Sequence, residues 1–301
     1  DSVSPRYYLS IFQMCYHTRI FYGLGSGVST LGRWRLPSDE FLNFPLPLPP
    51  LPEQHQIVSF LDEKTSLIDD LIKKKEQKIG LLKEYRTSLI NRVITMGLNP
   101  DCPMKDSGVE WIGMIPSHWD VSKVSRHFYM ERGRVISVEE IDRNIGEYPV
   151  YSSQTEYDGV LGRINTYDFD GEYVSWTTDG ANAGTCFFRS GKFNTTNVCG
   201  LLSPKQEGLY SLRYVSYLLN RGTRMYVRLD INPKLMNNMM GEIPISLPPL
   251  TEQEQIVSFL DEKTVEIDDT IQSERKKIEL LKEFRLSLIS SVITGKIKVV
   301  N

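Results

Sequence analysis

The sequence predicts an α+β fold in which a mixed α/β domain is joined to two long helices that form an antiparallel coiled coil. Three observations carry this prediction. A 53-residue segment occurs twice, at 46–98 and 245–297, and about 33 of the 53 positions match at a constant offset of 199. Both copies have apolar residues at coiled-coil spacing. Short β-type runs separated by turn residues lie between them.

Each copy of the repeat begins with a proline pair, Pro49-Pro50 or Pro248-Pro249, followed by Glu-Gln and then a helical pattern. The pattern continues for about 42 residues, which gives a helix of roughly 60 Å at 1.5 Å per residue. A helix of that length exceeds what an ordinary domain uses. Two separate core helices remain the alternative.

The apolar residues of both copies recur at alternating steps near three and four, which is the seam of a coiled coil. Two such seams in one chain predict that the helices pack on each other. Lys75 and Glu274 interrupt the seams at their midpoints, which meet in an antiparallel pair, so their opposite charges favour that pairing. The predicted seam residues are Leu61, Ile68, Ile72, Ile79, Leu82, Leu89, Val93, Leu260, Ile267, Ile271, Ile278, Leu281, Leu288 and Val292.

The segments around the repeat suggest a partly duplicated domain. The run SPRYYLSIF at 4–12 resembles SLRYVSYLL at 211–219, and each precedes a copy of the repeat. We therefore expect residues 1–45 to be the C-terminal remnant of a first domain that has lost its beginning. The expected divisions are 1–45, the first helix at 46–98, the second domain at 99–244 and the second helix at 245–301.

Within the second domain, β-type runs occur at 148–153, 159–164, 172–178 and 184–189, separated by Gly, Asn and Asp turns. Leucines and a valine on one face predict a helix at 209–220. Residues 228–244 show no regular pattern.

Catalytic signatures are missing from the sequence. It contains neither a Walker A loop nor an Asn/Asp-Pro-Pro-aromatic stretch, and Gly23, Gly25 and Gly27 lie in a loop context rather than between a strand and a helix. We expect no catalytic centre, bound cofactor or metal in this chain. The four cysteines have no metal-ligand spacing, and neither a signal peptide nor a membrane-length apolar run is present, so we expect a cytoplasmic protein without a membrane partner.

Charge is unevenly distributed in the second domain. Residues 139–179 carry ten acidic and two basic side chains, whereas residues 186–234 carry eight basic and two acidic ones. A basic sector is typical of phosphate contacts, although it could also be a solvated face that balances the acidic sector.

Basic side chains and turn amides or hydroxyls are therefore the candidate DNA contacts, the former for phosphates and the latter for base edges. For each polar candidate, a hydrogen bond within a turn is the alternative role. The basic candidates are Arg132, Arg134, Arg163, Arg189, Lys192, Arg224, Arg228 and Lys234. The polar candidates are Ser152, Ser153, Gln154, Thr177, Asn182, Asn194, Thr195 and Asn197.

The repeated segment LPPLxEQxQIVxFLDEKTxxID, followed by KIxLLKExRxSLIxxVIT, resembles the repeated regions of type I restriction–modification specificity subunits. The run KDSGVEWIGMIPSHW at 105–119 and YPVYSS at 148–153 resemble the same family. The resemblance covers essentially the whole chain.

This resemblance implies two target-recognition domains, each reading one half of a bipartite site on double-stranded DNA. The two helices would fix the gap between the half-sites and dock two modification subunits. Those subunits would bind S-adenosylmethionine and methylate adenine, while restriction subunits would use ATP and Mg. The chain departs from the family pattern at residues 1–45, so residues 105–244 are the one complete reader expected. The alternative function is a structural coiled-coil adaptor that binds only proteins.

Overall fold

The computed structural model describes residues 3–25, 35–229 and 232–299. Contacts divide the chain into two compact units, Asp1–Lys83 with Ile267–Asn301 (unit 1) and Glu84–Glu266 (unit 2). Each long helix contributes residues to both units, so the units do not coincide with the domain divisions expected from the sequence. Those divisions remain predictions.

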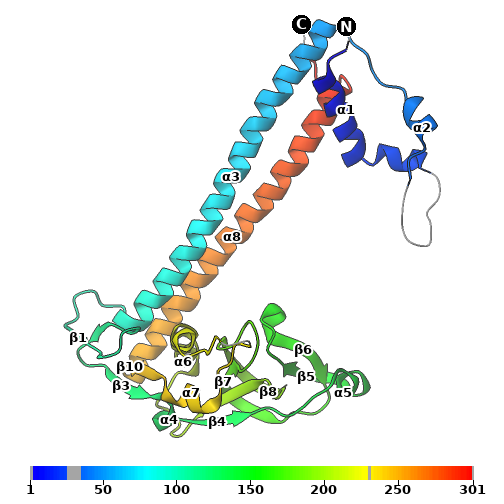
Figure 1. The fold of residues 1–301 in the computed structure, drawn as a ribbon. Helices are drawn as coiled ribbons and strands as arrows, with labels where there is room; N and C mark the ends of the chain where they lie inside the picture. The colour runs from blue at the N-terminus through cyan, green and yellow to red at the C-terminus, as the bar shows by residue number, and fades with distance from the viewer. Residues whose placement is uncertain (1–2, 26–34, 230–231, 300–301) are drawn as a thin grey trace. The chain divides into compact units, whose positions relative to one another are not determined.

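Unit 1 is helical (Figure 1). It contains α1 (Pro5–His17), the 3₁₀ helix η1 (Ile20–Leu24), α2 (Ser38–Leu42) and parts of the two long helices. These helices are α3 (Leu51–Met96) and α8 (Leu250–Ile293), with 46 and 44 residues. Within unit 1 they run antiparallel, which confirms the predicted fold class (Figure 1).

The predicted seam residues lie in the contact between α3 and α8. Eleven of the fourteen are buried, and Ile72, Leu82 and Leu281 are partly buried. In unit 1 the seam continues into the buried face of α1, where Tyr7 and Ile11 join Leu61, Leu288 and Val292 in one apolar cluster. This cluster fastens the N-terminal helix to the coiled coil by apolar burial.

Lys75 and Glu274 meet at the middle of the helix pair, as their opposite charges suggested. Lys75 Nζ lies 2.7 Å from Glu274 Oε2, and Lys78 Nζ lies 3.0 Å from Oε1. Lys277 adds a third cation at 3.1 Å, although the Glu274 side chain is only 5% exposed. Hydrogen bonds from the three lysines lower the pKa of Glu274 to about 2.

Unit 2 is built on a six-stranded sheet with the order β4-β9-β7-β8-β5-β6, in which only the β5–β8 pair is parallel. Two small antiparallel pairs, β1–β2 and β3–β10, accompany this sheet. The strands are β1 (Met104–Asp106), β2 (Met114–Pro116), β3 (Asp120–Lys123), β4 (Phe128–Arg132), β5 (Ile145–Tyr151), β6 (Val160–Ile164), β7 (Phe169–Thr177), β8 (Cys186–Thr195), β9 (Cys199–Pro204) and β10 (Pro244–Leu247).

Short helices connect these strands (Figure 1). They are α4 (Val124–His127), α5 (Val138–Arg143), the 3₁₀ helices η2 (Glu156–Gly159) and η3 (Thr223–Met225), α6 (Leu212–Gly222) and α7 (Asn237–Glu242). The helix predicted at 209–220 is thus α6, which begins where Ser211 caps it by accepting a hydrogen bond from Tyr214 N.

Two other expectations about local structure need correction. Residues 228–244 are not wholly irregular, because α7 buries Met240 and Gly241 within them. Its Asn-Asn-Met-Met sequence has weak helix propensity, and packing beside Met130 of β4 provides the stabilisation instead. Gly23 lies in η1 and Gly25 follows it, whereas Gly27 falls outside the described residues.

The core of unit 2 depends on one glycine. Trp176 of β7 faces Gly200 of β9, and a Cβ at Gly200 would lie 2.1 Å from the indole ring. The indole is fully buried and its Nε1 donates to Leu235 O at 3.0 Å. The tryptophan therefore holds the segment after residue 234 against the sheet.

The sequence repeat is reproduced as a repeated hydrogen-bond arrangement at the start of each long helix. In unit 1 Gln54 Oε1 accepts from Ser4 N, and its Nε2 donates to Pro49 O, both at 2.8 Å. In unit 2 Gln253 does the same with Ser211 N at 2.9 Å and Pro248 O at 2.8 Å. The match between α1 and α6 is thus structural as well as sequential.

We predict that Glu274→Gln lowers the urea midpoint of unfolding at pH 7 and that this deficit shrinks in acid. The folded pKa of about 2 lies below the ordinary carboxyl value of 4.5, so the stabilisation is fully present above pH 4.5. It is lost as the pH falls from 4.5 toward 2. Urea titrations of both proteins across this range measure the difference.

The matched control is Glu279→Gln on the same helix, since Glu279 pairs with Lys282 while 68% exposed. This variant should change the midpoint little at any pH. A Glu274→Gln deficit that is independent of pH would contradict the assigned role of the three lysines.

Candidate nucleic-acid interface

Several connections of unit 2 meet around the turn at 178–182, which follows β7. Thr178 N donates to Val198 O at 2.9 Å, which brings in the turn between β8 and β9. Gly180 N donates to Pro233 O at 3.0 Å, and Leu235 N donates to Thr178 O at 2.9 Å. The turn at 178–182, the turn between β8 and β9 and residues 233–235 therefore lie together beside the sheet. Binding loops are usually positioned by a rigid scaffold of this kind.

Basic side chains are exposed on this part of unit 2. The backbones of Arg228 and Lys234 form reciprocal hydrogen bonds of 3.0 and 3.1 Å. The two residues are therefore directly opposite each other. Lys234 Nζ lies 3.6 Å from Asp179 Oδ1 but is half exposed. Arg132 joins them, since its Nη2 lies 3.4 Å from Met236 Sδ.

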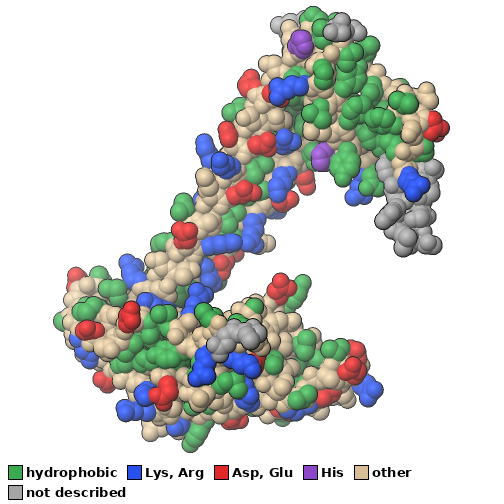
Figure 2. Space-filling view, in the orientation of Figure 1, with side chains coloured by type: hydrophobic (Ala, Val, Ile, Leu, Met, Phe, Trp, Pro, Cys, Tyr) green, Lys and Arg blue, Asp and Glu red, His purple; other side chains and the backbone are tan. Residues whose placement is uncertain are grey.

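Amide and hydroxyl groups lie beside these cations. Asn182 Nδ2 donates to Ser153 O at 3.5 Å, which connects the turn after β5 to the turn after β7. Asn182 and Asn197 are exposed, and Ser153 is half-buried. We call the set Arg132, Ser153, Asn182, Asn197, Arg228 and Lys234 the turn-178 surface. Figure 2 shows Lys and Arg side chains on the visible face of unit 2, with Asp and Glu side chains interspersed among them.

Four sequence-predicted contacts lie inside the domain instead: Thr177, Arg189, Asn194 and Thr195 are at most 2% exposed. Asn194 and Thr195 were expected beyond a strand that ended at residue 189, whereas β8 continues to Thr195. Thr177 and Arg189 were expected at the exposed ends of strands, but their side chains point into the domain. Thr177 donates its hydroxyl to Asn182 O, and Asn194 Nδ2 donates to Thr166 O at 2.7 Å. We therefore exclude these buried side chains from the candidate surface.

Three basic candidates are engaged away from the turn-178 surface. Arg134 forms ion pairs with Glu140 and Asp168 at 2.7 and 2.9 Å, which compensate its charge. Arg163 Nη1 donates to Glu147 O at 2.7 Å. The Lys192 ammonium lies 4.4 Å from the centre of the Tyr167 ring.

Arg224 contributes to a second basic site in unit 2. It lines a cavity of about 450 Å³ together with Arg86 and Arg221. Arg221 Nη1 donates to Asn91 O at 3.1 Å, and burial lowers the pKa of its guanidinium. Sequence reasoning missed Arg86 because its position on a predicted coiled-coil helix gave no sign that three arginines converge.

The turn at 152–159 presents an exposed aromatic side chain that the sequence did not indicate. Tyr157 is 84% exposed and has a φ of 50°, a left-handed conformation that is unusual for tyrosine. The turn closes through Ser152 N, which donates to Gly159 O at 2.9 Å. Gln154, also a predicted contact, donates its Nε2 to Val160 O and thereby supports the turn.

Arg189 of β8 anchors the turn at 152–159 to the sheet. Its guanidinium is buried, stacks 3.6 Å from the Tyr151 ring centre and donates from Nη1 to Asp158 Oδ2 at 2.7 Å. Its Nε donates to Ser175 Oγ at 3.1 Å. Burial lowers the pKa of Arg189 while Asp158 opposes that shift, so the carboxylate stabilises the buried charge. Arg189 thus positions the loop that carries Tyr157.

Among the residues that the structure describes, no group of three or more His, Cys, Asp or Glu side chains is placed to hold a metal ion. Within the same residues, none of the helices is both long enough and apolar enough to cross a bilayer.

We predict that Asp158→Asn destabilises the protein by about 1 kcal/mol, because the buried guanidinium keeps an acceptor but loses its charge, and the 68% exposure of Asp158 screens the ion pair. Protease cleavage at Tyr157 should increase as the turn loosens. Denaturant unfolding and limited chymotrypsin digestion measure these effects. Glu172→Gln, an exposed acid on β7, is the matched control, and equal stability of the two variants would refute the anchoring role.

Comparisons with known proteins agree with this architecture. The chain matches the model of the type I restriction modification DNA specificity domain over residues 7–81 and 116–283. It is 35% identical over 240 residues to S.MpnORF615P of Mycoplasma pneumoniae, described as a type I specificity subunit, covering 79% of this chain and 88% of that protein. The MpnII specificity subunit of the same organism is 42% identical over 155 residues, covering 51% of this chain and 46% of that protein.

Solved structures of type I restriction–modification proteins have the same fold as this chain. A chain from a type I restriction–modification system superposes with a TM-score of 0.75 at 14% identity, covering 97% of this chain and 71% of that chain. The HsdS subunit from Thermoanaerobacter tengcongensis gives a TM-score of 0.61 at 14% identity, with coverages of 98% and 71%. With the family model matching more than half of its residues, the chain belongs to the type I restriction–modification DNA specificity family.

Proposed function

We propose that this chain is the non-catalytic, DNA-reading subunit of a type I restriction–modification complex and that residues 105–244 read one half of a bipartite site. The turn-178 surface carries this proposal, since it combines exposed cations with amides on turns that a rigid sheet supports. Cations bind phosphates without regard to sequence, whereas amides can distinguish base edges in the major groove.

The basic cavity formed by Arg86, Arg221 and Arg224 fits a supporting role. Three guanidinium groups around about 450 Å³ form a site suited to phosphate oxygens. Because the site lies within unit 2, it would add affinity to the same domain that reads the bases.

We assign the catalytic steps to partner subunits. Two modification subunits would dock on the long helices and bind S-adenosylmethionine, and restriction subunits would use ATP and Mg. The helices would also act as the spacer between half-sites. The rival function, a coiled-coil adaptor without DNA readout, leaves the exposed amides and cations of the turn-178 surface without a role.

Exchanging residues 105–244 for the corresponding domain of a relative tests the reader assignment. In cells that supply the modification subunits, methylome sequencing should show that one half of the methylated site changes and the other half does not. Methylation at unchanged sites would refute the assignment.

We predict that the double variant Arg228→Ala with Lys234→Ala weakens DNA binding almost equally across sequences. Each phosphate contact contributes about 0.9 to the slope of log affinity against log salt, so this slope should fall by about 2. Fluorescence anisotropy of the full chain with its modification subunits, at several salt concentrations, measures the slope. Lys192→Ala should leave it unchanged, and an unchanged slope in the double variant would contradict phosphate contacts at this surface.

A further inference from the structure

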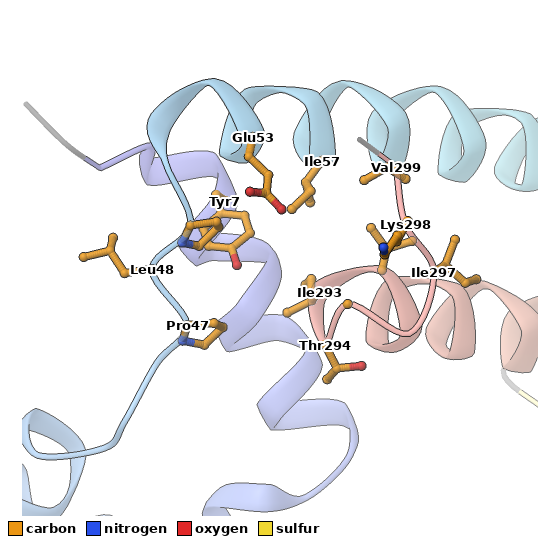
Figure 3. Close-up of a pocket in the computed structure, with 13 residues that line it drawn as sticks. Tyr7, Pro47, Leu48, Glu53, Ile57, Ile293, Thr294, Ile297, Lys298 and Val299 are labelled. Atoms are coloured by element: carbon orange, nitrogen blue, oxygen red, sulfur yellow. The ribbon is translucent and has the colours of Figure 1, made fainter. Parts of the chain in front are cut away.

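Two features of the molecule are not used by the proposed DNA contacts. The first is a cavity of about 640 Å³ in unit 1, where Figure 3 shows Tyr7, Glu53 and Ile293 around the space. Nothing among the described residues indicates what fills this cavity, and it carries no assignment. The second is the exposed ring of Tyr157 in unit 2, whose surroundings are more informative.

The turn at 152–159 joins β5 to β6 and exposes 84% of Tyr157. Tyr157, Asp158 and Gly159 all have left-handed backbone conformations, with φ values of 50°, 56° and 77°. Residues other than glycine adopt this conformation at an energetic cost, so two of them in succession persist only where the surrounding structure holds them. Strained backbone of this kind concentrates at ligand-binding sites. The strain therefore marks the turn as a candidate contact.

The turn is fixed to the sheet. Ser152 N donates to Gly159 O at 2.9 Å and closes the turn. The buried guanidinium of Arg189 donates to Asp158 Oδ2 at 2.7 Å, and a Cβ at Gly159 would lie 3.1 Å from its Nη2. A residue whose backbone is held in this way loses less conformational entropy on binding than one in a mobile loop. Tyr157 is thus exposed on a rigid support.

The turn at 152–159 is also in contact with the turn-178 surface. Asn182 Nδ2 donates to Ser153 O at 3.5 Å, so the turn after β5 and the turn after β7 touch. Both residues belong to the turn-178 surface, and Tyr157 follows Ser153 in the same turn. A duplex bound at that surface therefore meets Tyr157 as well.

The chemistry of the turn favours a base over a phosphate as the partner of Tyr157. Glu156 is exposed beside it, and a carboxylate repels phosphate oxygens, whereas it accepts a hydrogen bond from the amino group of cytosine in the major groove. The faces of the bases are planar, and stacking on an aromatic ring is favourable for every base. In a duplex, an inserted side chain reaches those faces by entering between two base pairs.

We propose that Tyr157 is a wedge that inserts its ring between two adjacent base pairs of the half-site and unstacks them. The chain thereby reads how easily this step is deformed, and pyrimidine–purine steps such as TA and CA unstack most easily. The inference rests on the proposed DNA reading by residues 105–244. It adds to that reading a contact that depends on stacking rather than on hydrogen bonds or charge.

DNA binding by the chain with its modification subunits tests the wedge, on the site that methylome sequencing identifies. Tyr157→Ala should weaken binding about 5- to 150-fold, which corresponds to roughly 1–3 kcal/mol at 1.4 kcal/mol per factor of ten. The slope of log affinity against log salt should stay the same, because no phosphate contact is lost. Tyr157→Phe keeps the ring and should bind as the unaltered chain does. The matched control is Tyr129→Ala, since Tyr129 is 57% exposed on β4 and lies outside the turn-178 surface, and its affinity should not change.

A single mismatch moved step by step across the half-site locates the wedge. At the wedged step it should tighten binding by the unaltered chain, because a mismatched step costs less to unstack. This gain should disappear in Tyr157→Ala. If every gain persisted in that variant, the unstacking would belong to the partner subunits and the proposal would be overturned.

The remaining outcomes separate the wedge from the proposed function. Specific binding of unchanged affinity in Tyr157→Ala would overturn the wedge and leave the DNA reading intact. Loss of the modification subunits from Tyr157→Ala in size-exclusion chromatography without DNA would assign the ring to a protein contact and overturn the wedge. Absence of specific DNA binding by the unaltered complex would refute the proposed function, and the wedge with it.

Discussion

A buried glutamine amide at the start of each long helix is the constraint on which the rest of each unit depends. Gln253 is 1% exposed, and its two polar ends join the first residue before α6 to the proline carbonyl that precedes α8. Gln54 does the same between α1 and α3. An unpaired buried amide is costly, so each glutamine permits only one arrangement of the short helix and the long helix.

In unit 2 this constraint reaches the candidate DNA surface through the core. Tyr214 of α6, also fully buried, has its hydroxyl within 3.2 Å of Ile94 O and 3.1 Å of Ser246 O, so α6 is tied to both α3 and β10. Thr223, just after α6, donates to Gly184 O at 2.7 Å beside the turn that leads into β8. The turn-178 surface is thus supported by the same elements that meet the long helices.

Repeats, helices and the central ion pair were predictable because they follow from local periodicity. The seam spacing of Leu61 and Ile68 and the opposed charges of Lys75 and Glu274 require no knowledge of distant residues. The strands of the six-stranded sheet were harder to predict from the sequence. β4 and β9 were missed, and β8 was predicted to end six residues early. Their pairing order depends on contacts far apart in sequence, such as Trp176 against Gly200, and neither residue type alone predicts such a contact.

The candidate site shows the same limit at the level of single side chains. Exposed turn residues such as Asn182 and Arg228 could be identified from composition, because turns after strands reach the surface. Arg189 could not be distinguished from them, since a basic residue on a predicted strand end is usually solvated. Its burial follows from the stacking of Tyr151 and Phe187 on the guanidinium and from the Asp158 carboxylate.

Charge pairing explains how a domain without net basicity can present cations. The strongest acid contacts of the acidic sector are internal, since Glu140 and Asp168 neutralise Arg134, and Asp158 compensates Arg189. Among the residues that the structure describes, the ion pair found for Arg228 and Lys234 is the weaker one between Lys234 and Asp179, at 3.6 Å. With Arg132, the turn-178 surface has three exposed cations, which give a modest electrostatic contribution at physiological salt, where the Debye length is about 8 Å. In the function proposed above, the Arg86–Arg221–Arg224 cavity and the partner subunits would supply further cations, and the turns that the buried ion pairs support would supply the specificity.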